Sequence, residues 1–193
     1  MPQHWLMTDA RLGHTLPQII AAMPPRSGVI IRPYAMAADG RVAMLRTIRR
    51  IGRAKRHLLL IADHRTPGFD GRHHGGPAAR LRPPSVGSLV SMPVHDRSEA
   101  GRAHRLKATL CLVSPVWPTR SHPGARVLGV RGFARLTAGL GKAVSVIALG
   151  GMNAERFKIL RRHGAKGWAA IDGWQERVTA GKALATHRVD KQD

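Results

Sequence analysis

The chain has 193 residues, of which 43% are hydrophobic, and this size and composition suit one folded domain and exclude a disordered chain. No apolar run approaches the roughly 18–20 residues that span a bilayer, so we expect no membrane segment. The first five residues lack the basic and apolar regions of a signal peptide. The single cysteine, Cys111, excludes an internal disulfide and a cysteine-based metal site. We expect it to be a buried free thiol and expect a cytoplasmic protein.

The formal net charge of +21 arises from 32 Lys+Arg against 11 Asp+Glu. A field of this sign attracts phosphorylated metabolites, nucleic acids or an acidic membrane surface. The arginines are scattered along the whole chain, whereas nucleic-acid footprints usually cluster on one element. Aromatic residues make up only 4%, which leaves little for stacking on bases. The charge therefore favours small phosphorylated partners over nucleic acid.

Short apolar runs alternate with amphipathic segments along the chain. In chain order, the expected strands are Trp5–Thr8, Val29–Arg32, Leu58–Ala62, Ser88–Met92, Leu110–Val113, Val144–Leu149 and Trp168–Ile171, with Gly71–His74 as a weaker additional strand. The expected helices are Leu16–Met23, Val42–Arg50, Ser98–Leu106, Phe133–Leu140 and Ala154–His163. The stretch Pro67–Pro84 is rich in Gly, Pro and Arg, which predicts a loop.

A strand followed by a helix, repeated along the chain, predicts right-handed βαβ units and a parallel sheet. About eight such units predict an α/β fold of the closed (β/α)8 type. We expect one small barrel domain over residues 1–181, with a polar tail over residues 182–193. The alternative is an open doubly wound sheet, which would usually carry a G-x-G-x-x-G motif after the first strand. That motif is missing from Asp9-Ala10-Arg11-Leu12-Gly13.

The junction between the Val144–Leu149 strand and the helix after it carries the strongest site signal. Gly150 and Gly151 follow the strand directly, and Asn153 is a good N-cap for the helix. Glycines let backbone N–H groups approach an oxyanion, and a helix N-terminus adds about half a positive charge. We predict a phosphate-sized anion site here, and the alternative is a tight turn that only requires glycine. In barrels, the loop after the last strand commonly joins such a site.

Three other strand ends carry groups that attract anions or metals. Thr119-Arg120-Ser121-His122 offers two hydroxyls, a guanidinium and an imidazole in four positions, which suits a phosphate or pyrophosphate. Arg32 closes an apolar strand, where a cation is costly without an anionic partner. Asp63 follows another strand, and a carboxylate there could bind Mg²⁺. The alternatives are a solvated loop for the first segment and structural ion pairs for Arg32 and Asp63.

Taken in order, these segments resemble the thiamine phosphate synthase family, including its TenI-like branch. The resemblance extends from Trp5 to Ile171, and the shared order and spacing of its pieces make it specific. The best-kept pieces are Gly-Gly-Met-Asn at 150–153, Pro115-Val116-Trp117-Pro118-Thr119, Gly164-Ala165-Lys166-Gly167 and Val94-His95-Asp96-Arg97-Ser98-Glu99-Ala100.

The resemblance implies a (β/α)8 barrel and a transferase. Synthases of this family join a hydroxymethylpyrimidine pyrophosphate to a thiazole phosphate, and Mg²⁺ and cations draw the pyrophosphate away. On matching positions, the resemblance implies catalytic roles for Arg32, Asp63 and His122, with Asp63 also binding the metal. It implies substrate or phosphate contacts for Thr119, Ser121, Gly150, Gly151, Ile171 and Asp172.

Several positions depart from the family pattern, mostly in the half that binds pyrophosphate and magnesium. The strand-two glutamine and lysine fall on Ile30 and Tyr34, and a second metal carboxylate is missing after His73-His74-Gly75-Gly76. The lysine of the Thr-x-Thr-Lys loop falls on His122, a weaker cation at pH 7. A serine near the end of strand eight falls on Asp172, whose carboxylate would repel a phosphate unless turned away or protonated.

Three functions stay open. The first is a divergent thiamine phosphate synthase. The second is a TenI-like thiazole phosphate isomerase or a non-catalytic barrel that binds a phosphorylated metabolite, although Ser114-Pro115 lacks the histidine of the TenI-like branch. The third is a basic protein that binds nucleic acid or another anionic surface. An oligomer is compatible with the sequence.

Overall fold

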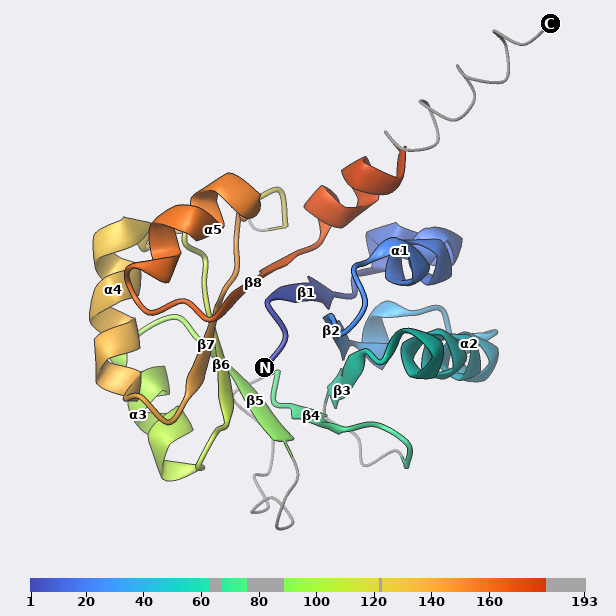
Figure 1. Cartoon of the computed structure of the whole chain (residues 1–193), viewed down its shortest axis with the longest axis horizontal. Coiled ribbons are helices and arrows are strands. Elements are labelled where there is room, and N and C mark those ends of the chain that lie inside the picture. Colours follow the sequence, from blue (N-terminus) through green and yellow to red (C-terminus); the bar gives the residue numbers. More distant parts are fainter. Residues whose placement is uncertain (63–66, 76–88, 122, 180–193) are drawn as a thin grey trace, which may run out of the picture.

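The protein forms a closed barrel of eight parallel strands in a computed structural model that describes residues 1–62, 67–75, 89–121 and 123–179 (Figure 1). In chain order the strands are β1 (His4–Met7), β2 (Gly28–Ile31), β3 (Leu58–Ala62), β4 (Gly71–His73), β5 (Leu89–Val94), β6 (Leu110–Val113), β7 (Ser145–Ala148) and β8 (Gly167–Ala170). Each strand pairs with its successor, and β8 pairs with β1. The predicted (β/α)8 fold is confirmed, and the open doubly wound alternative is excluded.

Helices surround the barrel on its outer side (Figure 1). They are α1 (Leu16–Ala22), α2 (Arg41–Lys55), α3 (Arg97–Arg105), α4 (Gly129–Leu140) and α5 (Ala154–Arg161), with short 3-10 turns η1 (Ala10–Thr15) and η2 (Pro33–Ala35). Residues 172–179 are also helical. Within the described residues, no helix is long and apolar enough to cross a membrane.

Helix α2 continues past the predicted end at Arg50 to Lys55. Gly52, a weak helix former, argues for an earlier end on propensity alone. In the structure Gly52 is buried, and a Cβ placed on it would lie only 2.7 Å from Leu59 Cδ1. Close packing of α2 on β3 therefore requires glycine here, so tertiary contact outweighs local propensity.

The start of α5 matches its sequence signal. Asn153 is the N-cap, and its side-chain oxygen accepts a hydrogen bond from the Arg156 N–H at 2.9 Å. The helix ends at Arg161, two residues before the predicted end at His163, and Gly164 follows with a φ of +94°. This cap fixes the direction in which the chain leaves the two glycines after β7.

The link between β3 and β4 is short, and the described part of it, residues 67–70, is a turn. Asp70 holds this turn against β3, because its N–H donates to the Leu59 carbonyl and its carboxylate accepts from the Leu59 N–H, both at 2.8 Å. The predicted loop Pro67–Pro84 thus contains β4, as the weaker strand prediction indicated. Residues 76–84 and the predicted tail lie outside the described residues.

The barrel interior is a packed apolar core rather than a channel. Trp5, Ile30, Leu60, Leu112 and Ile147 are fully buried within it. A second apolar layer lies between the strands and the helices. Because side chains fill the barrel axis, a ligand at the carboxyl ends of the strands has to bind above them, among the loops.

Cys111 is a buried free thiol in β6, as predicted. Burial raises its pKa to about 12, because the apolar surroundings disfavour the charged thiolate. The thiol is therefore un-ionised at neutral pH.

Candidate active site at the barrel mouth

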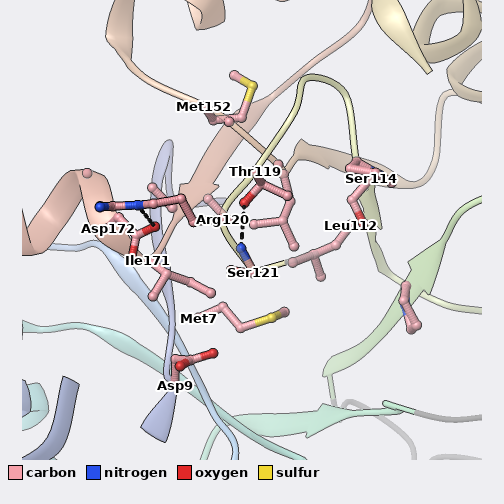
Figure 2. Close-up of a pocket in the computed structure, with 18 of the residues that line it drawn as sticks. Met7, Asp9, Leu112, Ser114, Thr119, Arg120, Ser121, Met152, Ile171 and Asp172 are labelled. Carbon is pink, nitrogen blue, oxygen red and sulfur yellow. Dashed lines mark hydrogen bonds and ion pairs between the residues drawn. The ribbon is translucent and has the colours of Figure 1, made fainter. Parts of the chain in front are cut away.

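A cavity of about 750 Å³ opens at the carboxyl ends of the strands (Figure 2). Its walls come from segments that follow most of the eight strands, as in barrel enzymes generally. The predicted site residues that line it are Arg32, Thr119, Ser121, Gly150, Gly151, Ile171 and Asp172. The structure therefore brings these seven residues to one place. The other two predicted catalytic residues, Asp63 and His122, lie outside the described residues.

The two glycines after β7 form a turn that no other residue type fits easily. Gly150 and Gly151 have φ values of +91° and +59°. A Cβ on Gly150 would lie 2.7 Å from Pro115 Cα, and one on Gly151 would lie 2.6 Å from the Pro118 carbonyl oxygen. The turn is thus pressed against the loop that follows β6.

Hydrogen bonds to that loop use the carbonyl side of the glycine turn. The N–H of Val116 donates to the Leu149 carbonyl at 3.0 Å, and the N–H of Trp117 donates to the Gly150 carbonyl at 3.1 Å. The N–H groups of Gly150 and Gly151 donate no hydrogen bond to another described residue. These donors sit in the cavity wall just before the N-terminus of α5, which is the arrangement that binds an oxyanion.

Arg156 adds a fixed cation beside this turn, and the sequence patterns did not single it out as a site residue. It lies in the first turn of α5, lines the cavity and donates from Nη1 to the Gly151 carbonyl. Its guanidinium stacks 5.2 Å from the centre of the Trp117 ring. These contacts hold the guanidinium plane in place while its other N–H groups make no hydrogen bond to described side chains.

The loop after β6 contributes Thr119, Arg120 and Ser121 to the cavity wall. In Figure 2 the Ser121 N–H points to the Thr119 hydroxyl, and Arg120 reaches Asp172. The Arg120–Asp172 contact is 3.3 Å, and the Arg120 side chain is 71% exposed. The hydroxyls of Thr119 and Ser121 and the exposed guanidinium of Arg120 therefore lie at the rim of the cavity, as the composition of this loop predicts.

Asp172 is held by arginines from two different loops. Arg11, in η1, donates from Nη1 to Asp172 at 3.1 Å and from Nη2 to the Ser121 hydroxyl at 2.7 Å. Arg120 approaches the other oxygen of Asp172. We call Arg11, Arg120, Ser121 and Asp172 the rim clasp. The repulsion expected between Asp172 and a phosphate is offset here by two adjacent guanidinium groups.

Arg32 forms an ion pair, which was the structural alternative considered for it. Its Nη2 donates to Asp9 at 2.9 Å and its Nε donates to the Thr8 carbonyl at 2.6 Å. Burial of Asp9 opposes its ionisation, but hydrogen bonds from Arg11 and the charges of Arg11 and Arg32 outweigh burial and lower the Asp9 pKa. Asp9 therefore stays ionised and fixes Arg32 at the cavity wall.

His73 closes the floor of the cavity from β4. It is 3% exposed, and its Nδ1 lies 2.9 Å from the Ser91 hydroxyl. Burial, the charge of Arg32 and neighbouring His74 lower the pKa of His73 to about 3. The imidazole is uncharged at neutral pH, so it supplies a neutral hydrogen-bonding group at the site.

The described carboxylates of the mouth do not form a magnesium site. Asp9 is paired with Arg11 and Arg32, and Asp172 with Arg11 and Arg120. No group of three or more His, Cys, Asp or Glu that could hold a metal occurs within the described part of the chain. The predicted metal ligand Asp63 lies outside it.

Fold and site define the chain as a small (β/α)8 barrel with a cationic cavity and a glycine turn at its mouth. The family model for thiamine monophosphate synthase matches residues 6–173. The chain therefore belongs to the thiamine monophosphate synthase family.

Relatives agree with this assignment. The "Putative thiamine-phosphate synthase 2" of Aquifex aeolicus (strain VF5) is 30% identical over 100 residues, which are 49% of this chain and 53% of that protein. The match thus spans about half of the relative. The structure of thiamine phosphate pyrophosphorylase from Pyrococcus furiosus is similar with a TM-score of 0.70 and 22% identity, over 88% of this chain and 85% of that one.

The same fold occurs in barrels of other function. Orotidine 5'-phosphate decarboxylase from Pyrococcus horikoshii OT3 has a TM-score of 0.60 at 11% identity, over 92% of this chain and 96% of that one. At such identities the likeness concerns the fold alone, so function has to be argued from the site.

Proposed function

We propose that this protein is a divergent thiamine phosphate synthase, which joins a hydroxymethylpyrimidine pyrophosphate to a thiazole phosphate and releases pyrophosphate. The observation that carries the proposal is the glycine turn: Gly150 and Gly151 line the mouth cavity next to Arg156, and their N–H groups donate no hydrogen bond to a described residue. Family membership suggests the class of reaction, and the glycine turn would bind one phosphate group.

Arg156 and the turn together suit the single phosphate of the thiazole substrate. Backbone N–H groups and a stacked guanidinium bind a dianion through charge-assisted hydrogen bonds, each contributing about 1.5–3 kcal/mol. The Trp117 ring and the Gly151 carbonyl hold the Arg156 guanidinium before the ligand arrives. The binding site is thus pre-organised, which lowers the entropic cost of binding.

On the other side of the cavity, Arg32 and the rim clasp suit the pyrophosphate. In the family's reaction, negative charge grows on the departing pyrophosphate, and fixed cations stabilise that charge without rearrangement. The Nη1 of Arg32 makes no hydrogen bond to a described residue, so it is available to a ligand. Arg120 supplies positive charge in the loop where the family's lysine falls on His122, and Arg11 adds a second cation from η1.

The test is a synthase assay with the purified full chain, both substrates and Mg²⁺, with thiamine phosphate measured directly. We expect turnover in the wild type, a loss of about tenfold or more in Arg156→Gln, and little change in Arg161→Gln. Arg161 is a matched control because it is an exposed arginine on the same helix outside the cavity. Addition of EDTA and the Asp63→Ala variant test the proposed dependence on Mg²⁺.

A second candidate is a phosphate-ligand binder without synthase activity. The pairing of Arg32 with Asp9 and of Arg11 with Asp172 favours it, because these carboxylates already neutralise both cations. Calorimetry separates the two: binding of thiazole phosphate without any product would support the binder and contradict the synthase. Absence of thiazole phosphate binding would contradict both.

A further inference from the structure

A second cavity lies at the opposite end of the barrel, where the strands begin. It has a volume of about 780 Å³ and shares no lining residue with the mouth cavity. Its walls are the segment before β2, the second half of α2, which lies beside β3 in Figure 1, and the turn before β4. We call it the basal cavity. The proposed synthase reaction makes no use of it.

The basal cavity is strongly basic. Its charged lining residues are Arg26, Arg49, Arg53, Arg56 and Asp70. Asp70 is engaged by the backbone of β3, where its carboxylate accepts from the Leu59 N–H. None of the four lining arginines forms an ion pair with another described residue. Four guanidinium groups therefore face one cavity with a single carboxylate among them.

His57 lines the same cavity but is not one of its cations. Its Nδ1 accepts from the Ser27 N–H, and its Nε2 lies 3.1 Å from the Ile20 carbonyl. Burial is the main cause that lowers its pKa, and the charge of Lys55 acts in the same direction. Both ring nitrogens are used within the fold, so His57 adds no charge to that of the arginines.

Arg49 is half-buried, whereas the other three lining arginines are exposed. Its Nε is buried and has no hydrogen-bond partner among the described residues. The guanidinium lies 5.7 Å from the centre of the Phe69 ring, and one of its Nη atoms lies against the Cα side of Gly68. Because Nε has almost no accessible surface, an anion in the cavity can reach this guanidinium only through its Nη atoms.

Arg26 and Arg56 stand at positions where arginine is locally costly. Their φ values are +61° and +54°, in the left-handed region that favours glycine. Both lie at turns on the rim of the basal cavity. Glycine would suit the backbone better at both positions, where the chain instead carries two arginines that line the cavity.

We propose that the basal cavity is a second anion site, which binds a ligand carrying two or more phosphate groups. Guanidinium groups pair with phosphate through two parallel hydrogen bonds, and four of them exceed what one phosphate can occupy. The volume lies in the range of small-molecule sites. Binding here is independent of the mouth cavity and of the proposed synthase reaction.

The experiment is calorimetric titration of the full chain with inorganic tripolyphosphate at about physiological ionic strength, where exposed charges are largely screened. We expect binding to weaken more than tenfold in Arg49→Gln/Arg53→Gln. The control double variant Arg46→Gln/Arg50→Gln removes the same charge from exposed positions on α2 outside the cavity, and we expect it to weaken binding less than threefold.

A second pair of variants separates binding from folding. Arg26→Gly and Arg56→Gly remove a cation and relieve a positive φ, so we expect each to bind tripolyphosphate more weakly while its Tm is unchanged or higher. Three outcomes overturn the proposal: no binding, equal weakening by both double variants, or binding that only Arg156→Gln abolishes. The last would assign the anion to the mouth cavity, and thiazole phosphate binding, measured in parallel, reports on that site separately.

Discussion

Replacing Gly151 by alanine tests the glycine turn directly. A Cβ at this position meets the Pro118 carbonyl oxygen at 2.6 Å and Trp117 Cβ at 2.9 Å, on a backbone with a φ of +59°. The positive φ costs about 1–2 kcal/mol for a residue other than glycine, and overpacking adds about 1–3 kcal/mol. We expect Gly151→Ala to lower the free energy of unfolding by about 2–5 kcal/mol, or the Tm by roughly 4–20 °C.

The same substitution shields the N–H groups of the turn. Loss of one charge-assisted hydrogen bond to phosphate costs about 1.5–3 kcal/mol, which weakens thiazole phosphate binding by about ten- to a hundredfold. Calorimetry measures the affinity, and thermal unfolding measures the stability. The matched control is Gly40→Ala, because Gly40 also has a positive φ, +79°, but no atom lies within 4 Å of its added Cβ.

We expect the control to lose about 1–2 kcal/mol of stability through strain alone and to bind thiazole phosphate like the wild type. If Gly151→Ala is folded and binds thiazole phosphate with unchanged affinity, the glycine turn does not hold the phosphate. Equal losses of affinity in both variants would mean that general destabilisation, rather than the turn, governs binding.

Three more outcomes follow from single residues. Asp172→Ser should strengthen pyrophosphate binding in calorimetry by freeing Arg11, whereas Glu176→Gln, at an exposed partner of Arg120, should change it little; weaker pyrophosphate binding in Asp172→Ser would contradict this. The His73 pKa of about 3 lies below the value of 6.5 for a free histidine. As the pH falls below 6.5, the unfolded chain therefore takes up a proton at this residue before the folded protein does. The free energy of unfolding falls between pH 6.5 and pH 3, by up to about 1.4 kcal/mol per pH unit. His73→Gln should flatten that slope in denaturant titrations, and an unchanged slope would refute the assignment. Cys111 should react with a thiol reagent at pH 8 only after denaturant is added.

The sequence was sufficient for the fold because apolar strands and glycine-marked turns are local signals. Strands β3 and β6 coincide with their predicted bounds, Leu58–Ala62 and Leu110–Val113. Helix ends were harder to place, because α2 passes through Gly52 where packing on Leu59 decides the outcome. The turns η1 and η2 were not predicted, since short 3-10 segments carry no periodic pattern.

For the site, the rule that functional residues gather at strand ends selected seven residues that line the mouth cavity, and their roles there stay predictions. It could not supply their partners. The Arg11–Asp172 contact joins residues 161 positions apart, and no pattern within one segment encodes it. Arg156 could have been found from the sequence, because it lies in the first turn of the helix that follows the two glycines. A cation there is unfavourable with respect to the helix dipole, which suggests that it has an anionic ligand. The roles of Asp63 and His122 stay predictions.

The seam between β1 and β8 has a consequence for how the chain is made. Residues 4–6 pair with residues 168–170, and the indole of Trp174 donates to the Trp5 carbonyl at 2.8 Å. Strand β1 can pair with β2 early in synthesis, but it can pair with β8 only after residues 168–170 have been made. Until then the growing sheet has two open edges, which can pair with other chains. Ring closure therefore requires synthesis of residues 167–170, and conditions that slow translation before Gly167 should favour aggregation over folding.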